Sequence, residues 1–412
     1  MLDISNEDAA VNRWLVILTS EPDTDHIVAA LARSVTRGQD IHVEIRGKAT
    51  QVMRARLQVL QRLGRLSISE SRFPSQSNSL RRKFLRVLHR RAHLRRWLKR
   101  EGFSLVILEW WDGIAGPPRS AVRKLRDRFL LDFSTQVQFA ARDLGVPIVA
   151  LPHGHALLTS ELTFPGNHAL EVATENSGRL PFGNRDSFDA YVVAHDSDRE
   201  FIVNRTQMSG NNVVVWGSAR FSPEWVHTLY EGTRESDVFR KHGLIKTTFF
   251  LPKWNSRINR PLTIDLLELL SRSRELDLVI AEHPRRGAST LTSDDRDRLR
   301  GANILAPGND SVSLVKASEC VIEISSSICI DAVLTGKCLV MPRYLQAAEA
   351  KTRLDESTVI VRTFDAASTL EAVLQRASAQ PDEFFLKQIA AHEDNDTLRR
   401  YDDGLRAIAA GG

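Results

Sequence analysis

The sequence predicts an α/β protein with two doubly wound domains, each a parallel β-sheet with helices on its faces. Three observations predict this class. Short apolar runs alternate with segments of helical periodicity along most of the 412 residues. Glycines at positions 38, 145 and 217 end three of these segments, as is typical of element boundaries. The hydrophobic fraction of 42% and the charged fraction of 26% fit a globular chain long enough for two domains.

The first half of the chain alternates strands with helices. The predicted strands are residues 14–19, 41–45, 66–69, 104–109, 146–151, 190–194 and 212–216. The predicted helices are residues 24–37, 49–64, 121–144 and 195–206, with a basic helix near residues 80–100. Strand, helix, strand, helix in this order predicts a doubly wound domain. The chain turns polar and acidic at residues 231–237, so the first domain is predicted to comprise residues 1–235.

A second alternating half follows. Its predicted strands are residues 247–251, 277–281, 303–305, 320–324, 338–341 and 358–362. Its predicted helices are residues 262–273, 294–299, 311–317 and 326–334. Residues 236–385 are therefore predicted as the second domain, and residues 386–412 as a C-terminal helical tail.

Polar residues follow two strands of the second domain. His283 and Pro284 come after one apolar run, and Ser325, Ser326 and Ser327 follow another and open a helix. Ligands of parallel sheets bind beyond the carboxyl ends of the strands, so both groups are expected at one ligand-binding edge. Serine hydroxyls and free backbone N–H groups suit a phosphate, and an imidazole can donate a proton to it. The plainer alternatives are a histidine satisfied by backbone groups and serines that only cap the helix.

The first domain carries a comparable edge. Glu109 ends one predicted strand and Asp112 lies in the glycine- and proline-rich loop that follows it. His153 and Gly154 follow the next strand, and Glu161 lies in a long segment without periodicity, which is usually functional or mobile. Asp112 has an alternative role as the cap of a turn, and His153 with Gly154 as a structural turn.

Several classes of protein are not expected. No apolar run approaches the roughly 18 residues of a membrane span, and residues 1–8 are acidic and polar, so the chain is expected in the cytoplasm. Cys320, Cys329 and Cys338 stand in apolar company without metal-ligand spacing, so buried thiols and no metal site are expected.

A basic segment breaks the even distribution of charge. Residues Arg81 to Arg100 contain ten Lys or Arg and no Asp or Glu, above an apolar helical stripe. One interpretation is a core helix with a solvated face. The other is a cationic surface for anionic lipid head groups or a phosphorylated glycolipid. Nucleic acid is not expected as a partner because no base-reading motif accompanies the charge.

The order of short motifs along residues 105–344 resembles a known family. The motifs are LPHG at 151–154, HDSDREF at 195–201, WGSARFSPEW at 216–225, the His283-Pro284 pair and the serine cluster. This order is similar to that of GT-B glycosyltransferases of bacterial surface polysaccharides that use CMP-activated acidic sugars, such as sialyltransferases and retaining β-Kdo transferases. It also resembles the capsule and CDP-glycerol polymerase group. The acidic motif typical of sialyltransferases is absent, with WDG at 111–113 as the nearest match.

The resemblance implies roles for individual residues. His283, Pro284 and the serines Ser325, Ser326 and Ser327 would hold the CMP phosphate, with Lys253 and Arg285 as nearby cations. Because a CMP donor needs no metal bridge between two phosphates, no metal and no cofactor besides the donor are expected.

The first domain would supply the chemistry at the sugar carbon. That chemistry needs a carboxylate as nucleophile or base, and the candidates are Glu161 together with Asp112, and Glu109. His153 would bring a side chain to the ligand, and Gly154 would let the backbone approach it. The two domains are expected to face each other across a cleft.

The hypothesis is a glycosyltransferase that moves an acidic sugar, Kdo first among them, from CMP to a lipid-linked surface glycan of a capsule or lipopolysaccharide. It would work in the cytoplasm, with peripheral contact to the inner membrane through the basic segment. Three alternatives stay open: transfer of glycerol phosphate from CDP-glycerol, epimerisation of a UDP-sugar, and a noncatalytic assembly protein.

Overall fold

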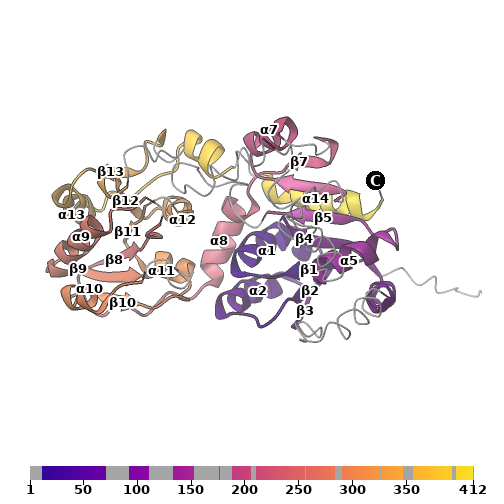
Figure 1. Ribbon diagram of the computed structural model, residues 1–412, viewed down its shortest axis with the longest axis horizontal. Helices are drawn as coiled ribbons and strands as arrows, with labels where there is room; N and C mark the ends of the chain where they lie inside the picture. The colour runs from indigo at the N-terminus through magenta and orange to yellow at the C-terminus, as the bar shows by residue number, and fades with distance from the viewer. Residues whose placement is uncertain are drawn as a thin grey trace, which may run out of the picture. The chain divides into compact units, whose positions relative to one another are not determined.

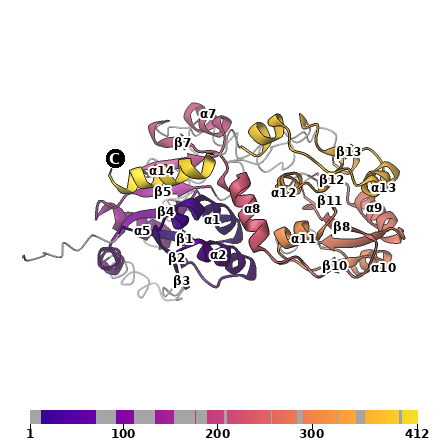
Figure 2. The same ribbon diagram turned by 180° about the vertical axis from the view of Figure 1, so that it is seen from behind.

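A computed structural model describes eleven parts of the chain. They are residues 12–70, 92–110, 133–152, 176, 188–205, 210–255, 257–283, 290–324, 326–346, 356–391 and 396–411. In these residues the chain forms two compact α/β units, seen from opposite sides in Figures 1 and 2. Of the described residues, the first unit contains those up to 152, residue 176, those between 188 and 220 and the C-terminal helix, and the second contains those between 221 and 391.

The described part of the first unit contains a seven-stranded parallel sheet of order β3-β2-β1-β4-β5-β6-β7. The strands are β1 (Arg13–Leu18), β2 (Asp40–Ile45), β3 (Leu66–Glu70), β4 (Phe103–Glu109), β5 (Ile148–Leu151), β6 (Ala190–Val193) and β7 (Val213–Val215). The helices are α1 (Glu21–Thr36), α2 (Gln51–Leu63), α5 (Phe133–Arg142), α7 (Asp196–Arg205) and α14 (Thr397–Ala409), with 3₁₀ turns η1 (Gly210–Asn212) and η2 (Ala219–Phe221).

The second unit has a six-stranded parallel sheet of order β10-β9-β8-β11-β12-β13 in its described residues. The strands are β8 (Ile245–Phe250), β9 (Leu276–Ala281), β10 (Asn303–Leu305), β11 (Cys320–Ile322), β12 (Cys338–Pro342) and β13 (Val361–Thr363). The helices are α8 (Pro223–Gly232), α9 (Arg260–Arg272), α10 (Ser293–Arg298), α11 (Ser311–Ala317), α12 (Ile328–Leu334) and α13 (Ala366–Gln375), with shorter helical turns η3 (Arg343–Leu345) and η5 (Phe385–Ile389).

Both sheets begin in the middle. In the first unit the chain adds β2 and β3 on one side of β1 and then returns to place β4 and the later strands on the other side. The second unit repeats this order, with β9 and β10 on one side of β8 and β11 to β13 on the other. Each unit therefore has a topological switch point, between β1 and β4 and between β8 and β11, where open parallel sheets bind their ligands. The predicted fold class, α/β with two doubly wound domains, is confirmed, and the cleft between the domains stays a prediction.

Local sequence explains where these elements form. Strands buried on both faces are continuous apolar runs, and residues 14–18 of β1 are completely buried. The helices begin at short polar residues that accept a backbone N–H: Ser20 caps α1, Thr50 caps α2 and Asn259 caps α9. All three cysteines are buried and free, as predicted.

The last helix belongs to the first unit. Helix α14, yellow in Figure 1, packs on α1. Its buried Asp402 accepts hydrogen bonds from Ser34 Oγ at 2.7 Å and from Arg37 at 2.5 Å. The hydroxyl of Tyr401 donates to the carbonyl of Gly217 at 3.0 Å. These contacts give the amphipathic helix a buried partner, so it differs from the separate tail predicted for residues 386–412.

The boundary between the units also differs from the predicted one at 235/236. Helix α8 packs on α11 and α12, which places residues 221–235 with the second unit. Lys316 of α11 fixes this arrangement, because its ammonium group donates to the carbonyls of Tyr230 at 2.6 Å and Thr233 at 2.8 Å. The polar, acidic residues that suggested a domain boundary therefore follow a helix of the second unit.

Candidate functional site

The switch point of the second unit brings together positions that the sequence analysis selected. Strands β9, β8 and β11 are neighbours, and the register pairs Phe250 with Ala281 and Phe249 with Ile322. The three strands therefore end at the same level. His283, Lys253 and the serine turn follow these ends within a few residues, so they share one edge of the sheet. Their roles stay predictions, and Pro284, Arg285 and Ser325 lie outside the described residues.

The serine turn is held by local hydrogen bonds. The backbone N–H of Ser326 donates to Oε1 of Glu323 at 2.5 Å, and Ser326 Oγ accepts from the backbone N–H of Ile328 at 3.3 Å. Ser327 is the N-cap residue of α12 but makes no side-chain capping hydrogen bond. The Ser327 hydroxyl is thus not used as a helix cap, and the Ser326 hydroxyl keeps its own proton for another acceptor.

Glu323 was not selected by the sequence analysis. It follows β11 directly and is only 1% exposed. Burial raises the pKa of its carboxyl to about 8, against the opposing effect of the hydrogen bonds from Ser326 and Ile324. Glu323 is therefore largely protonated at neutral pH. The signal in the sequence was a single acidic residue inside an apolar run, two positions before the first serine.

The loop after β8 is tied to the segment that follows β9. The indole Nε1 of Trp254, next to Lys253, donates to the carbonyl of Thr290 at 3.3 Å. The guanidinium of Arg260 lies 5.6 Å from the centre of the Trp254 ring and also pairs with Asp295, which closes the capping box of α10. These contacts hold the backbone beside Lys253 in a fixed position.

The acidic neighbour of His283 is neutralised. Glu282 forms an ion pair with Arg296 of α10, and its side chain is 7% exposed. Its charge is thus compensated locally, so it does not oppose an anionic ligand at this edge.

The edge of the first unit is described only in part. Glu109 ends β4, next to the switch point between β1 and β4, and is 5% exposed. The adjacent Trp110 is fully buried, and its indole Nε1 donates to the carbonyl of Val192 at 2.5 Å. The positions of Asp112, His153, Gly154 and Glu161 lie outside the described residues, so their predicted roles stay predictions.

A buried ion cluster lies in the first unit. Asp25 of α1 accepts from Nε of Arg56 at 2.6 Å and from Nε of Arg220 at 2.5 Å, and both arginines are 2% exposed. Burial alone would raise the pKa of Asp25, but the charges of Arg220 and Arg56 outweigh it and hold the pKa well below its usual range. Arg220 belongs to the GSARF motif. This motif therefore has a structural role, because it joins the turn after β7 to α1 and α2.

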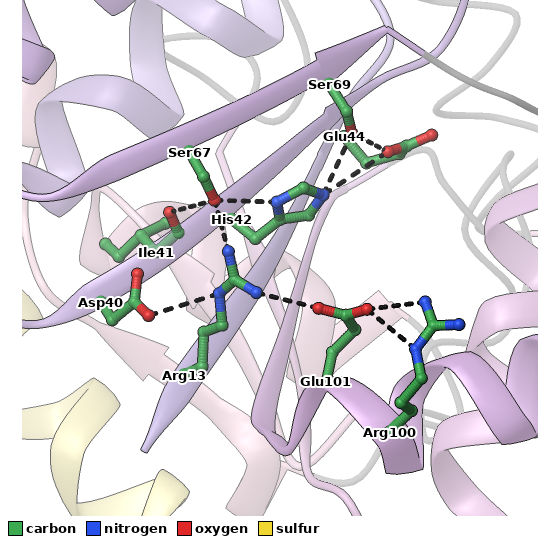
Figure 3. A network of polar contacts seen from close by, with 9 residues as sticks. All are labelled: Arg13, Asp40, Ile41, His42, Glu44, Ser67, Ser69, Arg100 and Glu101. Atoms are coloured by element: carbon green, nitrogen blue, oxygen red, sulfur yellow. Dashed lines mark hydrogen bonds and ion pairs between the residues drawn. The ribbon is translucent and has the colours of Figure 1, made fainter. Parts of the chain in front are cut away.

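A second polar network covers one face of β1, β2 and β3 (Figure 3). Its members are Arg13, Asp40, Ile41, His42, Glu44, Ser67, Ser69, Arg100 and Glu101. Ser67 Oγ lies 2.6 Å from Arg13 and 2.9 Å from Nδ1 of His42, while Arg13 also pairs with Glu101 at 3.1 Å. Because Arg13 is the first residue of β1, much of the network lies away from the carboxyl edge, and its contacts tie the helical residues 92–101 to the sheet.

Two other kinds of site are absent from the part of the chain that the structure describes. No group of three His, Cys, Asp or Glu side chains is placed to hold a metal ion there. Of the helices described, none has the length and apolar character that crossing a membrane requires.

Comparisons with known proteins show the fold. No protein-family model matches the chain, and no curated protein sequence matches it. Among solved structures, it is similar to UDP-GlcNAc 2-epimerase from Neisseria meningitidis bound to UDP-GlcNAc, with a TM-score of 0.56 and 11% identity over 97% of this chain and 100% of that chain. It is also similar to a putative UDP-N-acetylglucosamine 2-epimerase from Listeria monocytogenes (TM-score 0.54, 11% identity) and to S. aureus MnaA with UDP (TM-score 0.52, 12% identity), each over 97% of both chains.

Proposed function

We propose that the chain is a glycosyltransferase that takes its sugar from a nucleotide-sugar donor, with the nucleotide phosphate at the carboxyl edge of the second sheet. The observation that carries this proposal is the convergence of His283, Lys253 and the serine turn on the switch point between β8 and β11. A cation, hydroxyl donors and an imidazole at one sheet edge suit a phosphate better than a neutral ligand.

The proposed chemistry follows from the charge that develops on the leaving nucleotide. When the bond between the sugar carbon and the phosphate oxygen breaks, the electron pair stays on the phosphate, so donors and cations aimed at it lower the barrier. Lys253 would supply a cation, the hydroxyls of Ser326 and Ser327 would donate hydrogen bonds, and His283 would donate a proton. The acceptor hydroxyl gives its proton to a carboxylate, for which Glu109, Asp112 and Glu161 stay the candidates.

For the donor, we propose a CMP-activated acidic sugar, with Kdo as the first to test, and for the acceptor a lipid-linked surface glycan. The support is the order of the LPHG, HDSDREF, GSARF, His-Pro and serine motifs along the chain. A CMP leaving group carries a single phosphate. The few cationic and hydroxyl groups at this edge suit one phosphate better than a diphosphate.

A second candidate is epimerisation of a UDP-sugar. It is supported by the full-length fold likeness to UDP-GlcNAc 2-epimerases, which spans both units. The two functions differ in one requirement, because an epimerase converts its nucleotide-sugar without an acceptor.

Thermal-shift measurements with CMP, CDP, UMP, UDP and GDP test the proposal. A nucleotide at 100 times its dissociation constant stabilises the folded state by roughly 2.7 kcal/mol, which a melting curve detects. A shift with CMP supports the CMP-sugar donor, and product analysis with CMP-Kdo and a glycan acceptor then follows. A shift with UDP and UMP alone favours the epimerase, and no shift with any nucleotide contradicts both.

The predicted contact with an anionic membrane is part of the proposal. In the described part of the basic segment, Leu94 and Leu98 are buried while Arg96 and Lys99 are exposed, as the amphipathic pattern predicts. Co-sedimentation with vesicles of anionic or of zwitterionic lipid tests it. Binding to anionic vesicles only, weakened by Arg96→Glu with Lys99→Glu, supports the contact, since each basic residue contributes about 1 kcal/mol at such a surface. Equal sedimentation with both kinds of vesicle contradicts it.

A further inference from the structure

Glu323 links the end of β11 to the serine turn. Its backbone N–H donates to the carbonyl of Val340 on β12 at 3.2 Å, which continues the sheet by one residue. Its side chain folds back and accepts from the backbone N–H of Ser326 through Oε1 at 2.5 Å. One residue is therefore bonded both to the sheet and to the turn that follows it.

The second oxygen of this carboxyl is unusual. Oε2 of Glu323 is buried and has no hydrogen-bond partner among the residues that the structure describes. A buried polar atom without a partner costs about 1–3 kcal/mol of stability, and an apolar residue at this position would avoid that cost. An apolar residue would lose the hydrogen bonds from Ser326 and Ile324, and the one from the backbone N–H of Ser326 fixes the geometry of the turn.

We propose that Glu323 is a positioning residue of the donor site, which holds the backbone of the serine turn in the conformation that receives the anionic part of the donor. This inference rests on the proposed function. Ser326 and Ser327 touch the ligand in this scheme, whereas Glu323 acts through them. Its buried Oε2, which has no hydrogen-bond partner among the described residues, adds no contact that would explain the acid in another way.

The environment of Glu323 is compatible with an anion nearby. Burial raises the pKa of its carboxyl to about 8, so the group is largely uncharged at neutral pH and does not repel a phosphate. The thiol of Cys329 on α12 interacts electrostatically with Glu323 and also with Asp331, and burial raises the pKa of this thiol as well. An ionised carboxylate in place of the neutral acid would disfavour a phosphate at the same turn.

Two variants with one control test the proposal. Glu323→Gln keeps an oxygen that accepts from Ser326 and never ionises, whereas Glu323→Met keeps the length of the side chain but removes the acceptor. Glu319→Gln is the control, because Glu319 precedes the same strand at its amino end and pairs there with Arg376 at 3.0 Å. Isothermal titration calorimetry with CMP at pH 7.0 and 9.0 gives the dissociation constants, and melting curves without nucleotide show that each variant is folded.

We expect Glu323→Met to weaken CMP binding about tenfold at pH 7.0, the size of one lost hydrogen bond of about 1.4 kcal/mol. Glu323→Gln is expected to bind CMP within roughly threefold of the wild type at pH 7.0. Between pH 7.0 and 9.0 the wild type should lose affinity relative to Glu323→Gln, because only the wild type gains a negative charge at the turn. Glu319→Gln should follow the wild type at both pH values.

Two results overturn the inference alone. They are a Glu323→Met variant that binds CMP as tightly as the wild type, and a Glu323→Gln variant whose affinity changes with pH in parallel with the wild type. The second result is decisive even when Glu323→Met does not fold. If the wild type binds none of CMP, CDP, UMP, UDP and GDP, the proposed function fails and the inference is overturned with it.

Discussion

The backbone N–H of Ser326 lies 2.5 Å from Oε1 of Glu323, three residues earlier in the chain. This contact spans the point where β11 ends and the turn before α12 begins. A buried carboxyl normally destabilises a fold unless it is paired, and here it is paired by hydrogen bonds from Ser326 and Ile324 rather than by a cation. The consequence is a group that stays protonated in the folded chain and ionises on unfolding, so the stability of the protein depends on pH.

We predict that Glu323 makes the free energy of unfolding fall as the pH rises from about 4.5 to about 8. The pKa of Glu323 is about 8 in the folded chain, against an ordinary value of 4.5, so between these values the folded state holds a proton that the unfolded state has released. The stabilising contribution is fully present below pH 4.5 and is lost as pH approaches 8. Urea unfolding of the wild type and Glu323→Gln at pH 5, 6, 7 and 8 measures it. The stability difference should grow with pH in favour of Glu323→Gln, and a constant difference contradicts the assignment.

The ion cluster at Asp25 predicts a large loss of stability. Asp25 is the carboxylate shared by the buried guanidinium groups of Arg56 and Arg220. Asp25→Ala leaves both buried guanidinium groups without this partner. Breaking a buried pair costs about 3–5 kcal/mol, and because the side chain of Asp25 is 26% exposed we expect a loss near the lower end of that range. Urea unfolding at pH 7 checks the value.

The exposed pair between Asp265 and Arg298, at 2.7 Å, provides the matched control. Its side chains are 59% and 43% exposed, so solvent screens the interaction and Asp265→Ala should change stability little. If Asp25→Ala and Asp265→Ala lose similar amounts of stability, the ion cluster at Asp25 does not stabilise the first unit more than an exposed ion pair does.

In helix α14 we predict that a Gly→Ala change lowers stability, although the same change usually raises the stability of a helix. A Gly→Ala change in an exposed helix gains about 1 kcal/mol. At Gly404, however, an added Cβ would lie 2.3 Å from Cζ2 of Trp216, whose ring packs edge-on against Tyr401 at 5.2 Å. Overpacking of this kind costs about 1–3 kcal/mol, so Gly404→Ala should destabilise the first unit.

The control lies on the same helix. Ala407 of α14 is exposed, so Ala407→Gly tests propensity without packing and should cost about 1 kcal/mol. Thermal unfolding of both variants decides the matter. A higher melting temperature for Gly404→Ala would show that α14 does not pack against Trp216 in solution.

The strands were predictable because buried parallel strands are continuous apolar runs. Residues 14–19 were predicted as a strand and β1 spans Arg13–Leu18, whereas the last strand was predicted at 358–362 and is observed at Val361–Thr363. Short edge strands such as β13 have fewer buried residues, and their apolar signal is correspondingly weak. The alternation of strands and helices predicted parallel sheets whose strands end at a common edge, but the order of the strands within each sheet was not predicted and comes from the structure.

The sequence could not reveal contacts between distant positions. Asp25, Arg56 and Arg220 form one cluster only after the sheet has brought α1, α2 and the turn after β7 together. Glu323 falls within the strand predicted at residues 320–324. The apolar pattern of that strand does not indicate whether the side chain of its single acidic residue faces solvent or the interior. The docking of α14 on α1 was hidden for the same reason, since an amphipathic helix does not identify its partner.

His283 provides the most direct test of the proposed donor site. It follows β9 at the carboxyl edge, beside β8 and β11, and we expect His283→Ala to lower turnover of the donor at least about a hundredfold, the usual contribution of a positioned general acid. His242→Ala is the control, because His242 is exposed and precedes β8 at the opposite edge of the same sheet. Both variants should melt near the wild-type temperature. Because the imidazole acts on the phosphate, CMP should no longer shift the melting point of His283→Ala while it still stabilises His242→Ala. Unchanged turnover in His283→Ala, or equal losses in both variants, would remove His283 from the chemistry and leave the nucleotide without its proposed proton donor.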